Sequence, residues 1–487
     1  MRVLAFDFGA SSGRAMLGGF DGKTITLEEI HRFSNDPVRM NGTLYWDAPR
    51  LFFEIKEGIR KAKAKGGFDS IGVDTWGVDF ALLDQTGGLI ANPVHYRDER
   101  TEGMMELAFS RVPREEIYRR TGTQFMRLNT VFQLLALAEK RPDLLERAES
   151  LLLIPDFFHY LLTGEKKAEY TEATTTQMLN PRTGDWDRDL LERLGIPVRL
   201  LPEIIPSGSV CGLLTQELSE ELGVPRVPVI AVATHDTASA VAATPAAEKD
   251  FIYVSCGTWS LFGTEMDAPV INEKTQRFNL TNEGGYGGTI TLLKNIMGLW
   301  LIQESRRQWL REGFEVTYAD LEREALAEEP FVSFIDPDAP EFETPGNLPE
   351  RIRQFCQKTG QPVPENRGQV MRCVYESLAL KYRQAFDMIR ETTGRDYPAI
   401  HIIGGGAKDG FLCQLAADAC GVPVTAGPVE ATVLGNIAVQ LIALGGIPSI
   451  TEARKIIAAS GGFRAFEPHP TPAWESAYRR FQELLSC

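Results

Sequence analysis

The chain has 487 residues, of which 43% are hydrophobic and 24% are charged, and its formal net charge at pH 7 is -15. A single hydrophobic core rarely grows beyond about 250–300 residues, so the length predicts at least two domains. The composition is that of a globular protein, and the acidic balance argues against nucleic acid or an anionic membrane as a partner. No apolar run approaches the roughly 20 residues of a membrane span, and the first residues lack a signal-peptide core, so we expect a cytoplasmic protein.

The first elements predict a meander of three strands. Residues 3–8 ("VLAFDF") form a short apolar run, "RAMLGGF" (residues 14–20) follows a glycine- and serine-rich turn, and residues 24–33 alternate as a third strand. Backbone amides and hydroxyls at the first turn would face outward and suit a phosphate. The turn residues are Gly9, Ala10, Ser11 and Ser12.

A Walker-type phosphate loop is the competing interpretation of this region. The stretch "GGFDGKTIT" (residues 18–26) has glycines that are one residue too close, and a strand rather than a helix follows it. The stretch therefore predicts a hairpin turn.

The next residues alternate between helix and strand. Asp47 is a candidate N-cap and Pro49 lies early in the predicted helix, and the strand "SIGVDTW" (residues 70–76) follows that helix. This alternation predicts an α/β domain with helices packed over a sheet. Residues 100–206 are expected to be mostly helical.

The middle of the chain repeats the design of its first turn. Residues 251–266 ("FIYVSCGTWSLFGTEM") again read as strand, glycine turn and strand, and Gly257 lies about half the chain length after Gly9. Either hairpin alone is more typical of an ordinary turn than of a ligand site. The pair favours two similar domains that hold a polyphosphate.

One carboxylate stands in a stretch of small and apolar residues, "VPVIAVATHDTASAVAATP" (residues 227–245). Asp236 follows an apolar strand and opens a helix of small residues, which places its side chain at the end of a sheet. Spacing alone leaves two interpretations equally open: a helix N-cap, or a general base for proton transfer.

A glycine cluster follows a predicted strand that ends at Ile403. Three consecutive glycines (residues 404–406) would let a flat ligand approach the backbone, although close packing alone is an equal alternative. A helix with apolar residues at helical spacing follows and ends at Gly421. In the next helix, Gly435 and Ala438 would permit close packing.

Seven cysteines are scattered along the chain without a CxxC pair, at positions 211, 256, 356, 373, 413, 420 and 487. We expect reduced, mostly buried thiols rather than disulfides or a metal site.

Six motifs, in this order along the chain, closely resemble those of the FGGY family of carbohydrate kinases. They are "DFGASSGR" (Asp7 to Arg14), "DTWGVDF" (Asp74 to Phe80), "THDTASAV" (Thr234 to Val241), "SCGTWSL" (Ser255 to Leu261), "KNIMGLWLIQESRRQW" (Lys294 to Trp309) and "GGGAKDG" (Gly404 to Gly410). The family usually carries threonine where this chain has Ala10, so one hydroxyl is absent from the predicted phosphate turn.

The resemblance implies an α/β fold with two actin-like, ribonuclease-H-like domains, each a mixed sheet flanked by helices, with ATP bound in a cleft between them. We expect an N-terminal domain over residues 1–243 and a C-terminal domain over residues 244–487. The domains would close on the substrates. The oligomeric state would be a monomer or a homodimer.

The implied activity is transfer of phosphate from ATP, accompanied by Mg²⁺, to the 1-hydroxyl of a ketose. The expected substrate is L-rhamnulose, and its phosphorylation would serve sugar catabolism. L-Fuculose and xylulose are the alternative substrates. A nucleotide-switch protein of the actin type, without kinase activity, is an alternative from another class. Asp236 and its sugar-contact neighbours separate the two, because such a switch would not need them.

The resemblance also implies a role for individual residues. Asp236 would be the general base and Asp7 the carboxylate closest to the metal. The sugar would contact Gly77, His235, Asp236, Thr237 and Asn295. The nucleotide would contact Ala10, Ser11, Ser12, Gly13, Arg14, Thr258, Gln303 and Gly405.

Overall fold

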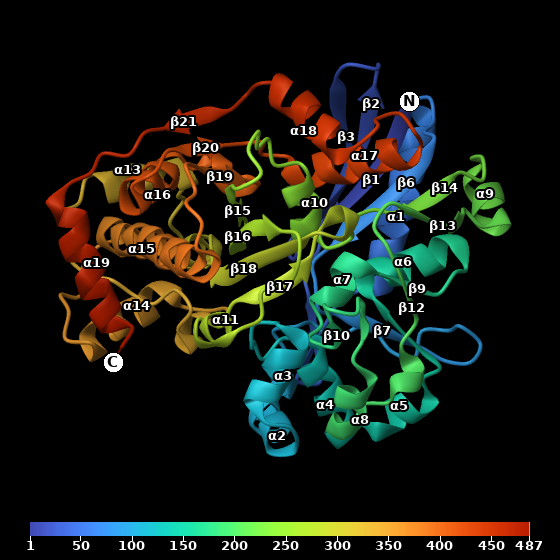
Figure 1. Cartoon of the computed structure of the whole chain (residues 1–487), viewed down its shortest axis with the longest axis horizontal. Coiled ribbons are helices and arrows are strands. Elements are labelled where there is room, and N and C mark those ends of the chain that lie inside the picture. Colours follow the sequence, from blue (N-terminus) through green and yellow to red (C-terminus); the bar gives the residue numbers. More distant parts are fainter. Residues whose placement is uncertain (487) are drawn as a thin grey trace. The chain divides into compact units, whose positions relative to one another are not determined.

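The computed structural model describes residues 1–486 and divides into two compact units (Figure 1). The first unit contains residues 1–247, 265–292 and 431–461, and the second contains residues 248–264, 293–430 and those from 462 onward. Within residues 1–486, no helix has the length and apolar character that a membrane crossing requires.

A six-stranded mixed sheet forms the centre of the first unit. Its central strands are parallel, whereas the strands on either side run antiparallel to their neighbours. In spatial order the strands are β13 (Ser209–Leu213), β14 (Pro228–Ala231), β6 (Ser70–Thr75), β1 (Arg2–Phe8), β2 (Ser12–Phe20) and β3 (Ile25–Ser34).

The structure confirms the predicted meander and the hairpin turn after residue 20. β1, β2 and β3 pair successively as antiparallel neighbours. The Walker-type alternative fails because β3, and not a helix, follows "GGFDGKTIT".

Helices cover both faces of this sheet. α1 (Ala48–Ala64) and α6 (Ile154–Thr163) contribute to one apolar core with β1 and β6, and α17 (Ala431–Ala443) packs against β1 and β6 through other residues. The predicted cap is confirmed, since the Asp47 side chain accepts a hydrogen bond from the Arg50 amide. Further helices of this unit are α9 (Gln216–Leu222), α10 (Asp236–Ala242), α11 (Glu273–Arg277) and α18 (Ile450–Ala459).

Residues 100–206 are mostly helical, as predicted, but they also supply short strands. The helices there, besides α6, are α2 (Met104–Arg111), α3 (Arg114–Thr121), α4 (Thr130–Lys140), α5 (Pro142–Arg147), α7 (Tyr170–Thr174) and α8 (Arg188–Leu194). The short strand pairs are β7 (Phe80–Leu83) with β8 (Ser150–Leu153), β9 (Lys167–Glu169) with β12 (Glu203–Ile205), and β10 (Leu179–Asn180) with β11 (Asp185–Trp186).

A seven-stranded mixed sheet forms the centre of the second unit, and it repeats the arrangement of strands in the sheet of the first unit. A hairpin pairs antiparallel strands, and the first strand of that hairpin pairs in parallel with the next neighbour, β19. In order the strands are β17 (Thr281–Gly284), β18 (Ile290–Met297), β16 (Trp259–Met266), β15 (Ile252–Cys256), β19 (Ile400–Ile403), β20 (Val424–Ala426) and β21 (Arg464–Phe466). The division between the units falls within β16 and β18, and β17 belongs to the first unit.

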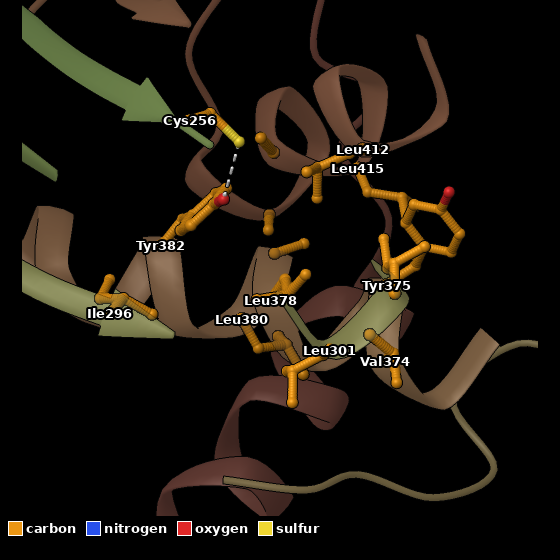
Figure 2. Packing of buried hydrophobic residues seen from close by; sticks show 14 of the residues in the cluster. Cys256, Ile296, Leu301, Val374, Tyr375, Leu378, Leu380, Tyr382, Leu412 and Leu415 are labelled. Atoms are coloured by element: carbon orange, nitrogen blue, oxygen red, sulfur yellow. Dashed lines mark hydrogen bonds between the residues drawn. The ribbon is translucent and has the colours of Figure 1, made fainter. Parts of the chain in front are cut away.

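The core of the second unit forms around its longest helix, α15 (Arg367–Thr393). Figure 2 shows Tyr375, Leu378 and Tyr382 of this helix among buried residues from β15 and α16. The helices of this unit are α12 (Trp300–Arg311), α13 (Tyr318–Leu326), α14 (Leu348–Lys358), α15, α16 (Gly410–Cys420) and α19 (Pro472–Leu484).

The described cysteines are free thiols, as predicted. Five of them are buried and Cys420 is half-buried, while Cys487 lies outside the described residues.

Candidate active site

The first predicted phosphate turn joins β1 and β2 and is closed by backbone hydrogen bonds. The Gly9 amide donates to the Ser12 carbonyl at 3.0 Å. Asn35, directly after β3, stabilises the turn, since its side-chain amide donates to the Gly9 carbonyl at 2.9 Å and its backbone amide donates to the Ser11 carbonyl at 3.1 Å. Ser11 is exposed, and Ala10 and Ser12 are half-buried. The turn is therefore a fixed loop whose tip faces solvent.

Gly13 and Arg14 follow this turn with different local functions. A Cβ atom on Gly13 would lie 2.3 Å from the Phe33 ring, so this buried glycine is required for packing. The Arg14 guanidinium donates to Oδ2 of Asp7 from Nε at 2.9 Å and from Nη2 at 2.8 Å. The cation predicted to contact nucleotide thus neutralises the carboxylate predicted to approach the metal.

Asp74 lies directly opposite Asp7, because β1 and β6 pair in parallel with these residues in register. Asp74 is fully buried, and burial together with the negative charge of Asp7 raises its pKa well above the usual range. Its Oδ2 accepts a 2.6 Å hydrogen bond from Asn436 of α17, and its Oδ1 has no hydrogen-bond partner among residues 1–486.

This pair of carboxyl groups fits a Mg²⁺ ion. A cation beside Asp7 and Asp74 would offset the repulsion that raises the Asp74 pKa, and both groups offer the oxygen ligands that Mg²⁺ prefers. No group of three or more His, Cys, Asp or Glu side chains among the described residues could hold a metal alone. A cation here would therefore need oxygen ligands from nucleotide phosphates and water.

Asp236 is the first residue of α10, at the carboxyl end of the apolar segment that begins with β14. The N-cap interpretation is wrong: His235 occupies the cap position, and no side chain caps the helix there. The Asp236 side chain is 32% exposed, and burial and the charge of Asp7 raise its pKa to about 7. Thr237 donates a 3.3 Å hydrogen bond to its Oδ1. A reachable carboxylate with a pKa near neutrality can accept a proton.

His235 lies between two carboxyl groups and is almost completely buried. Its Nε2 lies 3.6 Å from Oδ1 of Asp236, and its Nδ1 lies 3.4 Å from Oε2 of Glu283. Burial lowers the His235 pKa to about 4, so the ring is neutral at pH 7 and can both donate and accept hydrogen bonds.

Gly77 lies in the loop after β6, next to a strained residue. Val78 has a φ angle of 69°, which a β-branched residue rarely adopts. Thr175 holds this conformation by accepting the Val78 amide at 3.1 Å, and Thr130 donates to the Val78 carbonyl at 2.6 Å. A Cβ atom on Gly77 would approach Thr175 within 3.1 Å. Strain of this kind is typical of functional sites.

The first unit brings all its predicted site residues to one edge of its sheet. β14, β6 and β1 are adjacent and parallel, so their carboxyl ends meet. The Thr75 amide donates to the Thr234 carbonyl at 2.9 Å, and the Trp76 amide donates to the Phe8 carbonyl at 3.2 Å. The predicted phosphate turn, the Gly77 loop and the start of α10 therefore lie at the same edge of the sheet.

The second unit holds the remaining predicted residues around its own hairpin turn. Thr258 donates a 3.4 Å hydrogen bond to Oε1 of Gln303 in α12. Gly405 is exposed in the turn after β19, and a Cβ atom there would meet only the Cys256 carbonyl at 3.9 Å. Asn295 is half-buried on β18, beside Lys294, whose pKa burial lowers to about 8.

Three buried polar side chains pack beside this hairpin turn. The hydroxyls of Ser260 and Tyr382 lie 2.6 Å apart, and the Cys256 thiol lies 3.6 Å from the Tyr382 hydroxyl (Figure 2). Gly406 packs on the same thiol, since a Cβ atom there would lie 2.1 Å from Sγ of Cys256. In the glycine cluster, Gly406 is thus required for packing, whereas Gly405 leaves its surface open.

Several residues at these sites were not identified from the sequence. Asp74 lies inside a recognised motif but received no role, and only the register with Asp7 shows its proximity. Asn35, Glu283 and Asn436 belong to segments without a recognised motif, and Glu169 received no role; their contacts join residues distant in the chain. A local pattern carries no signal for such pairs.

The structure has two units with mixed sheets, and each has a glycine-containing hairpin turn at a strand end. Together with the Asp236 carboxylate, this arrangement is typical of a two-domain α/β phosphotransferase. Residues 2–243 match the family model of the N-terminal domain of the FGGY family of carbohydrate kinases, and residues 252–444 match the model of its C-terminal domain. The chain belongs to the FGGY family of carbohydrate kinases. It is therefore a carbohydrate kinase, and kinases of this family use ATP. This membership excludes the alternative of an actin-type switch without kinase activity.

Full-length relatives are similar along almost the whole chain. The chain is 43% identical over 482 residues to a rhamnulokinase of Bacteroides thetaiotaomicron, with 99% of both chains covered. It is 46% identical over 455 residues to a rhamnulokinase of Oceanobacillus iheyensis, with 93% of this chain and 96% of that one covered.

Solved structures of lower identity share the fold. A ligand-bound xylulose kinase from Lactobacillus acidophilus superposes with a TM-score of 0.80 at 19% identity, covering 100% of this chain and 96% of that one. A Plasmodium falciparum glycerol kinase with ADP gives a TM-score of 0.76 at 17% identity, covering 100% and 97%. These similarities confirm the predicted fold of two α/β domains.

Proposed function

We propose that the protein phosphorylates L-rhamnulose at its 1-hydroxyl, giving L-rhamnulose 1-phosphate and ADP. Two full-length relatives at 43% and 46% identity are rhamnulokinases. The observation that carries the proposed mechanism is Asp236, a one-third-exposed carboxylate with a pKa near 7 at the carboxyl edge of the first sheet.

Asp236 is proposed as the general base. It accepts the proton of the sugar 1-hydroxyl while that oxygen bonds to the γ-phosphorus of ATP and the bond to the bridging β,γ oxygen breaks. Orientation and charge neutralisation dominate such a transfer, so the neighbours of Asp236 matter as much as its basicity.

The sugar is proposed to contact both units. His235, neutral at pH 7, and Thr237 flank the base, and Gly77 offers a backbone without a side chain. Asn295 would contribute its amide from the second unit.

The nucleotide is proposed to bind the two hairpin turns. Its phosphates would contact the turn over residues 10–14, and Thr258, Gln303 and Gly405 would contact the rest of the nucleotide. Gly405 suits a close approach because it is exposed and carries no side chain.

Asp7 is proposed to lie closest to Mg²⁺, with Asp74 as its neighbour. When bound, the ion would neutralise charge on the phosphates. Arg14 would release part of its contact with Asp7 in that state.

Three further expectations belong to this proposal. The boundary between the two kinase domains would lie between residues 243 and 244. The protein would act in the cytoplasm, and it would be a monomer or a homodimer.

A panel of ketoses tests the proposed substrate. The purified protein is assayed with MgATP and L-rhamnulose, L-fuculose or D-xylulose by following ADP release, and the phosphorylated carbon of the product is identified by NMR. We expect kcat/KM for L-rhamnulose to exceed the others by about tenfold or more, the usual size of discrimination by a few contacts. A preference for L-fuculose or xylulose would overturn the substrate assignment and leave the kinase assignment intact.

A further inference from the structure

Glu169, at the end of β9, is a fully buried carboxylate to which no role was assigned. One of its oxygens, Oε2, accepts hydrogen bonds from five donors on three residues. They are the Thr171 amide (2.9 Å), the Thr171 hydroxyl (2.5 Å), the Glu172 amide (3.1 Å), the Thr234 amide (3.2 Å) and the Thr234 hydroxyl (2.7 Å). The Ser207 hydroxyl donates to the other oxygen, Oε1.

Such a carboxylate costs free energy to bury unless hydrogen bonds replace the lost water. Burial raises the Glu169 pKa, and the hydrogen bonds from Ser207, Thr171 and Thr234 oppose that shift. The group thus joins β9 and α7 to residue 234, two positions before the proposed base.

Thr171 extends this connection by one residue. Its hydroxyl oxygen accepts the His235 amide at 3.3 Å while its hydrogen is donated to Glu169. The backbone amides of Thr234 and His235 therefore donate to a single carboxylate and one hydroxyl. Asp236 follows directly, and its side chain accepts a hydrogen bond from the neighbouring Thr237.

Two more threonines of the same segment hold other parts of the proposed sugar site. Thr174 accepts the Gly284 amide at 2.7 Å, next to Glu283, which lies 3.4 Å from His235. Thr175 accepts the amide of the strained Val78, next to Gly77. Residues 169–175 thus contact three segments that come from distant parts of the chain: Val78, residues 234–235 and Gly284.

We propose that Glu169 is a positioning residue for the kinase reaction: through Thr171 and Thr234 it fixes the backbone that carries His235 and Asp236. This inference rests on the proposed function of Asp236. It does not depend on which ketose is the substrate.

The test compares Glu169→Ala with Glu169→Gln. Glutamine keeps a carbonyl oxygen for the donors from Thr171 and Thr234, and its amide can donate to the Ser207 hydroxyl, which also accepts. Alanine removes every acceptor. We expect kcat to fall about 100-fold in Glu169→Ala, because displacement of a reacting group by about 1 Å has that effect, and to stay within about fivefold of wild type in Glu169→Gln.

A matched control and a second readout separate positioning from general loss of stability. Glu54 is also a buried carboxylate of the first unit, hydrogen-bonded to His31, and Glu54→Ala should leave kcat unchanged. The dissociation constant of an ATP analogue should stay within about twofold in Glu169→Ala, and amide hydrogen exchange of residues 232–237 should accelerate in this variant but not in Glu169→Gln.

The outcomes distinguish this inference from the proposed substrate. Kinetics are measured with whichever ketose the wild-type protein phosphorylates best, so failure with L-rhamnulose refutes only the substrate. Wild-type kcat in Glu169→Ala, or equal losses in the alanine and glutamine variants, would overturn the positioning role. If Glu169→Ala does not fold, Thr171→Val replaces it and Thr171→Ser is the rescue: a lower kcat only in the valine variant supports the proposal, and equal kcat in both refutes it.

Discussion

Asp236 owes its raised pKa to its location, first through burial and then through the charge of Asp7. A general base works only as the carboxylate anion, which predominates above its pKa. We therefore expect kcat/KM for the sugar to rise about tenfold per pH unit below pH 7 and to level off above it. A pH profile at saturating MgATP measures this limb, and a profile that is flat from pH 5 to pH 8 would contradict it.

Asp236→Asn is the control for that assignment. Asparagine keeps the size of the side chain but cannot take up the proton, so turnover should fall by a factor of about 10² to 10⁴. Nucleotide binding, measured by calorimetry, should change little. Turnover within a few-fold of wild type would refute the role of Asp236 as base.

A substitution of Glu172 is expected to change the stability of the protein rather than its turnover. Its carboxyl group is fully buried, and neither oxygen has a hydrogen-bond partner among residues 1–486. Burial, reinforced by the charge of Asp156, raises its pKa well above the usual range. The folded protein therefore holds this proton up to a higher pH than the unfolded chain does, and this group lowers the free energy of unfolding as pH rises above about 4.5.

Glu172→Gln removes this pH-dependent contribution while conserving shape. We expect the variant to gain stability relative to wild type as pH rises from 5 to 8, with a slope of at most about 1.4 kcal/mol per pH unit. Urea unfolding at several pH values measures the difference. A difference that is independent of pH, or one that shrinks toward pH 8, would show that Glu172 is charged in the folded protein.

At the scale of single residues, the sequence predicted those that lie inside motifs and missed their partners. Asp236 and His235 follow from "THDTASAV", whereas Glu283 and Glu169 contact that segment from distant positions. The cap assignment failed for a local reason: spacing does not distinguish the residue before a helix from its first residue, and His235 takes the cap position.

Helix α17 shows how one element places another. A Cβ atom on Gly435 would lie 1.8 Å from the Ser239 carbonyl oxygen of α10, so the two helices touch through their backbones. Asn436 binds Asp74, and Gln440 accepts a 2.6 Å hydrogen bond from Ser70 and donates to the Leu4 carbonyl at 3.2 Å. The expected close packing at Gly435 is confirmed, and it fixes the helix that begins at Asp236.

Gly435→Ala should therefore be destabilising, although alanine is the better helix former by about 1 kcal/mol. The added methyl group meets a backbone oxygen, which cannot rotate away, so we expect a net loss of about 1–3 kcal/mol and lower kcat from displaced α10. Thr432→Ala on the same helix, where the side chain is half-buried, serves as the control. Unchanged stability in Gly435→Ala would mean that the helices separate at little cost.

Elements with a strong local pattern were predictable, and elements defined by pairing were not. The two hairpins, the Asp47 cap and the end of α16 at Gly421 all follow from neighbouring residues. The pairing of β9 with β12 joins short strands that are stabilised only by the surrounding fold. Their sequences do not alternate for long enough to indicate a strand.

The proposed ligand contacts are distributed over both compact units. The first unit carries the turn over residues 10–14, Gly77 and the segment from His235 to Thr237, while Thr258, Asn295, Gln303 and Gly405 belong to the second. The chain passes between the units several times, because residues 265–292 and 431–461 return to the first. If a ligand makes contacts of both sets, we expect the two units to close when it binds and to open when the product leaves.

Ligand-dependent closure is therefore expected for the whole molecule. Small-angle scattering should show a smaller radius of gyration with sugar and a non-hydrolysable ATP analogue together than in the free protein, with intermediate values for either ligand alone. The forward scattering at several concentrations gives the molecular mass and so separates a monomer from a homodimer. An unchanged radius of gyration under both saturating ligands would contradict closure, and the ligand contacts would then have to lie within arrangements already present in the free protein.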